Sequence, residues 1–224
     1  TPFDFSDYRS YVRVLKEIGV TEVEHAVKAL RSRSQFDRFR EAVDYIHSEG
    51  LEAILYTGAF GTEDLSVNPS LARYAQRDAQ GAVLSYFGGG PRVAMMCPSS
   101  SYVDDVLLPS LKRKVVAGGV DAVFFDIPWL MPGACHCPCD HYGADSGVVV
   151  RGGLQRLVDG LRSHAPRLRL GVNASAPTIH DNRASGGHID QLRGLFDEYV
   201  TEWNPYRWHQ PASVVKKCLS YARS

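Results

Sequence analysis

The amino-acid sequence repeats one unit, in which a helix ends at a glycine and an apolar strand follows. The first two units end their helices, predicted at 6–18 and 34–49, at Gly19 and Gly50, and lead into strands at 20–27 and 51–57. The pattern recurs with helices at 102–117, 149–164 and 188–196 and with strands at 121–127, 168–173 and 198–203. Strands that alternate with helices of this length predict a parallel β/α architecture.

Polar side chains end strand after strand of this pattern, namely Thr57, Asp126, Asn173 and Glu202. In a closed barrel these ends converge on one mouth, where barrel enzymes place their chemistry. An open nucleotide-binding sheet is disfavoured because no glycine-rich phosphate loop follows an early strand. The sequence therefore predicts one domain over residues 1–224, a TIM-type (β/α) barrel in which five to seven strands are recognisable. Residues 58–100 form a long loop insertion with a helix near 70–80 and a short strand at 93–96.

Composition narrows the class of partner. The 25 basic side chains balance the 25 acidic ones, so nucleic acid and membrane surfaces are disfavoured, and no apolar run approaches the ~20 residues of a membrane span. The odd number of cysteines, five, and the lack of a signal-peptide pattern favour a reducing compartment, so we expect a cytoplasmic protein. The oligomeric state stays open, with a homo-oligomer among the alternatives.

Asp126 is the first candidate for catalysis. It ends the apolar run of residues 123–125, so its carboxylate lies where a buried strand reaches the surface. Such a position suits a nucleophile or a general acid, and the alternative is a helix N-cap or a loop salt bridge. Glu202 has the same placement on the last strand. Two strand-end carboxylates in one barrel fit the catalytic pair of a glycosidase.

Four further residues are predicted to bind substrate. The Asn173 amide suits a hydrogen bond to a sugar hydroxyl or to a carboxylate, and a polar cap on the barrel is its alternative. Trp129 and Trp203 lie near the two carboxylates in the sequence and offer faces on which a sugar ring stacks, although rims of barrels also pack with aromatic rings. Tyr56, on the strand before the insertion, completes the set. His180 and His188 are interpreted as solvated loop residues outside the site.

A cysteine cluster is the second chemical signal. In an extended segment the alternate residues Cys135, Cys137 and Cys139 point to one side, and Cys97 is a fourth thiol. Four thiolates suit a structural zinc ion, and the alternative is a loop of reduced free thiols. We therefore expect a structural zinc site.

Two segments carry a resemblance to known families. Residues 122–127 and 135–139 resemble the strand and cysteine loop of hypothetical glycosyl hydrolases related to α-amylase and fucosidase barrels, and residues 90–102 resemble a segment of zinc-carrying β-galactosidases. The resemblance implies that Asp126 is the nucleophile and that Glu202 is an acid/base or a substrate-binding carboxylate. In this chain one residue, rather than two, separates the second and third cysteines of the loop, which departs from the families' pattern.

Three functions remain as alternatives. The first is a glycoside hydrolase with Asp126 and Glu202 as its carboxylates, whose carboxyl carbons would lie about 5–5.5 Å apart in a retaining enzyme and about 6.5–9.5 Å apart in an inverting one. One strand lies between the strands that end at Asp126 and Glu202, which favours the longer distance. The second is a zinc-dependent hydrolase that uses the cysteine and histidine cluster. The third is a non-catalytic carbohydrate-binding barrel.

Overall fold

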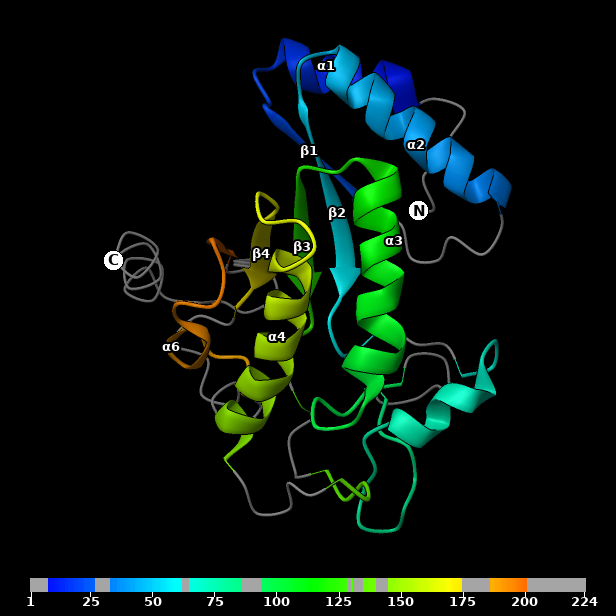
Figure 1. The fold of residues 1–224 in the computed structure, drawn as a ribbon, viewed down its shortest axis with the longest axis vertical. Helices are drawn as coiled ribbons and strands as arrows, with labels where there is room; N and C mark the ends of the chain where they lie inside the picture. Colours follow the sequence, from blue (N-terminus) through cyan, green and yellow to red (C-terminus); the bar gives the residue numbers. More distant parts are fainter. Residues whose placement is uncertain are drawn as a thin grey trace, which may run out of the picture.

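A computed structural model describes residues 8–26, 33–61, 65–85, 94–128, 130, 135–139, 145–174 and 186–200. Its five strands pair in parallel, in the order β1-β2-β3-β4-β5, and curl into a half-barrel (Figure 1). The prediction of a TIM-type β/α barrel with fewer than eight strands is therefore confirmed. The strands are β1 (Glu22–Ala26), β2 (Glu52–Gly58), β3 (Ala122–Asp126), β4 (Arg169–Asn173) and β5 (Glu198–Val200).

Five α-helices are described, and the main ones match the sequence prediction within a few residues. Gly19, Gly50 and Gly119 each have a left-handed backbone just after a helix, which is why these glycines end their helices. A single turn of π-helix, η2 (Val103–Leu107), leads into α3. Asp145 caps α4, because its Oδ1 accepts the Gly147 amide at 2.8 Å. The helices are α1 (Tyr8–Glu17), α2 (Arg33–Ser48), α3 (Leu108–Gly118), α4 (Ser146–Arg162) and α6 (Ile189–Leu192).

The core lies between the convex face of the half-barrel and the helices beside it (Figure 1). Alternate strand residues point outward to this core, and each fully buried one contributes about 1.5–3 kcal/mol. The intervening residues face the concave side, where Ile54, Tyr56 and Phe124 are only half-buried. The half-barrel thus has one packed face and one open face. The outward-facing core residues of the strands are Val23, Ala53, Leu55, Val123, Phe125, Leu170 and Val172.

Two predicted helices are shorter in the structure. The helix expected near 70–80 is a 3₁₀-helix, η1 (Pro69–Tyr74), because the next residues pair with the chain around Met96 instead. The backbone N–H of Gln76, for example, donates to the Met95 carbonyl at 2.7 Å. The helix expected at 188–196 ends at Leu192, and Gly194 follows with a φ of 80°. Tertiary pairing in the first case and a left-handed glycine in the second override the helical periodicity.

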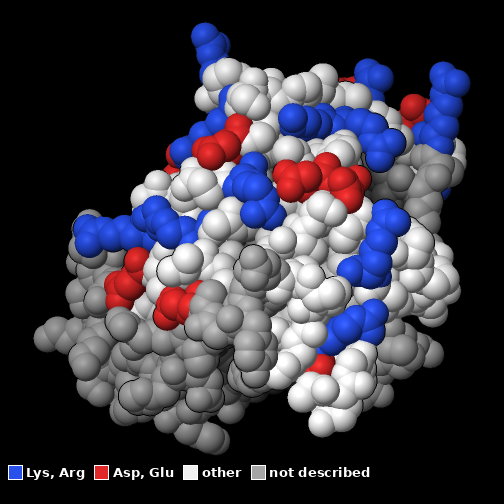
Figure 2. Space-filling view, turned by 60° about the horizontal axis from the view of Figure 1, so that its bottom comes forward, with Lys and Arg blue, Asp and Glu red and all other residues white. Residues whose placement is uncertain are grey.

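Charged side chains of both signs are interspersed on the surface. On the face seen in Figure 2, basic and acidic side chains lie beside one another. Arg9 of α1 pairs with Glu41 of α2 at 2.7 Å, and Lys16 of α1 pairs with Glu49, the residue after α2, at 3.1 Å. No helix in the described parts of the chain has both the length and the apolar character that crossing a bilayer requires.

A cationic side chain holds the amino-terminal end of the sheet together. Arg169 on β4 donates to Glu22 of β1 at 3.0 Å, to Glu198 of β5 at 2.6 Å, and also to Glu52 of β2. One guanidinium therefore links four strands at the end opposite the predicted mouth. Because Arg169 is about a third exposed, solvent screens these ion pairs in part.

We expect Arg169→Met to lower the free energy of unfolding by about 1–2 kcal/mol, because three carboxylates would then face one another without a cation. The measurement is urea unfolding followed by circular dichroism. Arg162→Met is the matched control, since Arg162 forms a single exposed ion pair with Asp197 at 3.0 Å and should cost under about 1 kcal/mol. Equal losses of unfolding free energy in the two variants would show that the link between four strands contributes no more than a single exposed ion pair.

Candidate functional site

Asp126 ends β3, and three donors hold its half-buried carboxylate. The Tyr56 hydroxyl donates to Oδ2 through a short hydrogen bond. The Asn173 side-chain amide donates to Oδ1 at 3.0 Å, and the backbone N–H of Ile127 donates to the same oxygen at 2.9 Å. Both carboxylate oxygens therefore have hydrogen-bond partners, and these partners fix the orientation of the side chain.

The strand register explains why these residues meet. Gly58 of β2 is the partner of Asp126, so Tyr56 lies two residues earlier on the same concave face. Asn173 ends β4, the strand next to β3. The Tyr56 ring also stacks on the ring of Phe124, with centroids 6.0 Å apart and planes 24° apart. This stacking fixes the direction in which the phenol reaches toward Asp126.

A hollow of about 260 Å³ lies on the concave face beside this carboxylate. Tyr56 and Asn173, which both donate to Asp126, also line the hollow. Its apolar wall comes from residues such as Ile54 and Phe124. Its volume is near the lower end of ligand sites, which begin at about 300 Å³. Three carboxylates, Glu22, Glu24 and Glu198, line the rest of it.

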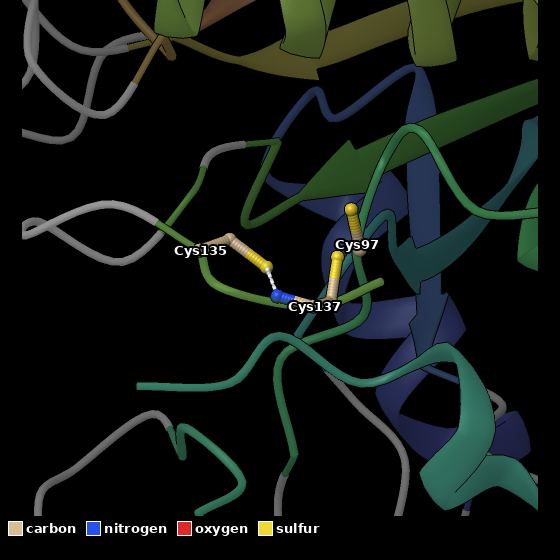
Figure 3. Close-up of side chains that lie close together, drawn as sticks. All are labelled: Cys97, Cys135 and Cys137. Carbon is tan, nitrogen blue, oxygen red and sulfur yellow. Dashed lines mark hydrogen bonds between the residues drawn. The ribbon is translucent and has the colours of Figure 1, made fainter. Parts of the chain in front are cut away.

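The cysteine cluster is the second candidate site. The sulfur atoms of Cys97, Cys135 and Cys137 lie within 4.8 Å of one another and point into one space between two segments (Figure 3). All three residues are buried, and none of them forms a disulfide. Cys139 is half-buried and packs against the cluster. The structure thus brings three of the four predicted ligands together and places the fourth at their edge.

Backbone hydrogen bonds hold these cysteines in place. The Cys97 amide donates to the Tyr74 carbonyl at 2.8 Å, and the Met96 amide donates to Phe60 at 2.6 Å. On the other segment the His136 amide donates to the Arg77 carbonyl at 2.8 Å. The cluster therefore joins the insertion after β2 to the loop that follows Asp126 at the end of β3.

The three sulfurs also perturb one another's protonation. The Cys97 thiol donates toward Cys135 and lowers the pKa of Cys135 to about 5, with a further contribution from the Cys137 thiol and amide. Burial, together with the neighbouring thiols of Cys139 and Cys135, raises the pKa of Cys137 to about 12. The hydrogen bond to Cys135 and burial raise the pKa of Cys97 as well. One thiolate held by two thiols is a compact set of sulfur donors for a soft divalent metal ion.

The fit to zinc can be judged from distances. In a tetrahedral site with Zn–S bonds of about 2.3 Å the sulfurs lie ~3.8 Å apart. The observed limit of 4.8 Å needs only a small closing movement. A disulfide would need a much shorter sulfur separation, about 2.05 Å, and none is formed among these residues. The donor set therefore fits a structural metal ion.

Several predicted residues cannot be placed in this site. Glu202, Trp129 and Trp203 lie outside the described residues, so their roles stay predictions. The assignment of Tyr56 and Asn173 to substrate binding also stays a prediction, and the structure shows in addition that both hold Asp126.

The interpretation of His188 as a solvated loop residue is wrong. It is fully buried and caps α6, since its ring accepts the Asp190 amide at 3.3 Å. His188 and Gln191 form a capping box in the structure, but the usual sequence signature has Ser or Thr at the first position, so a histidine there gave no signal.

The fold is of the kind found in barrels of glycoside hydrolases. The chain matches no protein-family profile, and no curated protein matches it in sequence. One similar solved structure is a cycloisomaltooligosaccharide glucanotransferase of Paenibacillus sp., with a TM-score of 0.71 and 9% identity over 100% of this chain. A GH36 α-galactosidase of Geobacillus stearothermophilus has a TM-score of 0.64 and 12% identity over 98% of this chain. An α-amylase of Lactobacillus plantarum has a TM-score of 0.62 and 13% identity over 87% of this chain. The expected resemblance is therefore confirmed as one of fold.

The matched region is a minor part of those proteins. The chain spans 35%, 30% and 48% of the glucanotransferase, the α-galactosidase and the α-amylase respectively. An α-L-fucosidase of Paenibacillus thiaminolyticus is similar to the same extent, with a TM-score of 0.61 and 32% of its length covered.

Proposed function

We propose that this chain carries a glycoside hydrolase site and that Asp126 is its reacting carboxylate. The observation that carries the proposal is the placement of Asp126 at the carboxyl end of β3, with both oxygens held by Tyr56, Asn173 and the Ile127 amide. Barrels place their chemistry at this end of the strands. The glycoside hydrolases among the similar structures support a carbohydrate as the substrate.

The hydrogen bonds indicate which catalytic role suits Asp126 and which role a second residue must fill. A carboxylate that accepts three donors is suited to attack an anomeric carbon or to stabilise positive charge there. The proton for the leaving group must then come from a second acid. Glu202 remains our candidate for that acid.

The hollow beside Asp126 supports a neutral sugar. Glu22, Glu24 and Glu198 line it, and like charges would repel a carboxylated or phosphorylated ligand. Arg169 neutralises part of this charge at the far end of the strands. Hydroxyl groups of a neutral sugar match the acceptors that the carboxylates offer.

The test is hydrolysis of a panel of aryl α- and β-glycosides of glucose, galactose and fucose, with the anomer of the first product read by NMR. Release of the phenol with retained configuration indicates a nucleophilic carboxylate, and inversion indicates a general base. Binding of a sugar in calorimetry without any release would support the non-catalytic carbohydrate-binding alternative. A protein that neither binds a sugar nor releases the phenol would refute the proposal.

We also propose that Cys97, Cys135 and Cys137 hold a structural zinc ion, with Cys139 as the fourth ligand. The proximity and burial of the three sulfurs support it, and so does the contact of Cys139 with Cys137. The alternative of a catalytic zinc needs an open coordination position for water. Four thiolates would leave none. Free thiols of this kind also fit a reducing compartment such as the cytoplasm.

A further inference from the structure

The residue after Asp126 has an unusual backbone. Ile127 has a φ of 52° and, among the described residues, is the single one besides glycine with a positive φ. A β-branched side chain in this left-handed region costs roughly 1–2 kcal/mol. Pro128 follows, and the residue before a proline prefers a φ near −120°. Two separate effects therefore oppose the conformation that Ile127 adopts.

Hydrogen bonds from the neighbouring strand end hold this turn. The Ala59 amide donates to the Asp126 carbonyl at 2.7 Å, and the Phe60 amide donates to the Ile127 carbonyl at 3.3 Å. The segment after β2 thus extends its pairing with β3 beyond the end of the sheet. The Ile127 amide is left to point back at Oδ1 of Asp126, at 2.9 Å.

Gly61 makes room for the Ile127 side chain. A Cβ atom at position 61 would lie 2.5 Å from Cγ2 of Ile127, a distance that real Cβ atoms essentially never show. The next contact, Sδ of Met95 at 3.0 Å, belongs to a flexible side chain that can shift. Ile127 is buried, at 7% exposure, so its branched side chain has little space in which to move aside. The absence of a side chain at position 61 is therefore matched to the turn at Ile127.

We propose that Gly61 and Ile127 are positioning residues for Asp126. The hydrogen bond from the Ala59 amide fixes the peptide group whose N–H points at Oδ1, and Gly61 permits the left-handed turn that follows by leaving space for Ile127. Together with Tyr56 and Asn173 the Ile127 amide fixes the rotation of the carboxylate. Strained backbone of this kind persists where the surrounding structure enforces it, and it is enriched at functional sites. The inference rests on the proposed function and extends it to two residues that need not touch the substrate.

The test compares four variants on the best substrate of the glycoside panel. Gly61→Ala should lower kcat at least about tenfold with KM within about twofold, since a shift of about 1 Å in a reacting group can cost 10²-fold. Ile127→Gly should keep kcat within about threefold, because glycine adopts a positive φ freely. The double variant Gly61→Ala/Ile127→Gly removes the clashing methyl group and should recover most of the lost kcat.

Gly152→Ala is the control, since a Cβ at this exposed position in α4 meets nothing within 4 Å. Its kcat should be unchanged. Thermal unfolding of each variant separates loss of fold from loss of positioning.

Three results would overturn the inference, and they are distinguishable from failure of the proposed function. Wild-type turnover with an unchanged kcat in Gly61→Ala would refute the positioning role alone. Loss of kcat in Gly61→Ala that the double variant does not restore would do the same. A crystal structure with Ile127 in an extended backbone would refute it even if Gly61→Ala failed to fold. A wild-type protein inactive on every glycoside would instead refute the proposed function and the role that depends on it.

Discussion

Asp126→Asn is expected to fold normally and to lose at least about 10³-fold in kcat. The substitution keeps the volume of the side chain and leaves an oxygen that can accept from Asn173 and the Ile127 amide. The Tyr56 hydroxyl can rotate to accept from the new amide group. What disappears is the negative charge that would attack or stabilise an anomeric carbon.

The measurement is kcat on an activated aryl glycoside, with thermal unfolding as the check on fold. Asp121→Asn is a matched control, because Asp121 lies just before the same strand at its opposite end. There it contacts His47 at 2.8 Å and accepts the Ala53 amide at 2.8 Å. That variant should lose stability and keep kcat. Comparable losses of kcat in both variants would remove Asp126 from the mechanism.

Azide separates the possible roles of Asp126. In Asp126→Ala the space left by the carboxylate admits a small anion, which attacks the anomeric carbon as the aryloxide departs. If the wild type retains the configuration, partial recovery of turnover with formation of a glycosyl azide of inverted configuration would identify Asp126 as a nucleophile. If azide gives no recovery, Asp126 acts as a base or through its charge alone.

The sequence predicted the strands and the position of Asp126 at the end of one of them, because both depend on local signals. Glycines such as Gly19 and Gly50 have left-handed backbones just after helices, and the apolar run before Asp126 marks a buried strand. These features are readable from neighbouring residues. The prediction of a helix near 70–80 was wrong because a distant contact, the pairing of Ala75 with Met96, determines the conformation there.

Local reasoning reached only part of the contacts around Asp126: it expected the Asn173 amide to bond to a hydroxyl or a carboxylate, but it did not expect the contact from Tyr56. Tyr56 and Asn173 reach it through the register of three strands, and the sequence alone does not determine that register. Gly61 meets Ile127 across a separation of 66 residues. A glycine after a strand is common, so its packing against one particular isoleucine leaves no sequence signature. Cys97 differs, because its residue type alone made it the predicted fourth thiol of the cluster, and the structure places its sulfur beside those of Cys135 and Cys137.

The purified protein is expected to contain about one zinc ion per chain. The reason is the burial of three sulfurs within 4.8 Å of one another, with Cys139 beside them. Binding of a structural zinc contributes directly to folding, because the unfolded chain holds no preformed site. Cys135→Ser should therefore lose the metal and lower Tm by about 10 °C or more. Cys218→Ser keeps the four proposed ligands and serves as the control, with zinc content and Tm unchanged.

Removal of the metal by a chelator tests whether its role is structural. The cluster ties the insertion after β2 to the loop that follows Asp126, and the hydrogen bond from the His136 amide to the Arg77 carbonyl joins the same two segments. Loss of the ion should therefore lower Tm at once, while kcat at 25 °C falls only as far as the folded fraction falls. A catalytic zinc would give the reverse, with kcat abolished and Tm nearly unchanged. Elemental analysis that finds no metal, with all five thiols titrating freely, would refute the site altogether. If Cys139→Ser kept both the metal and the Tm, three thiolates and another donor would hold the ion, and Cys139 would have no part in it.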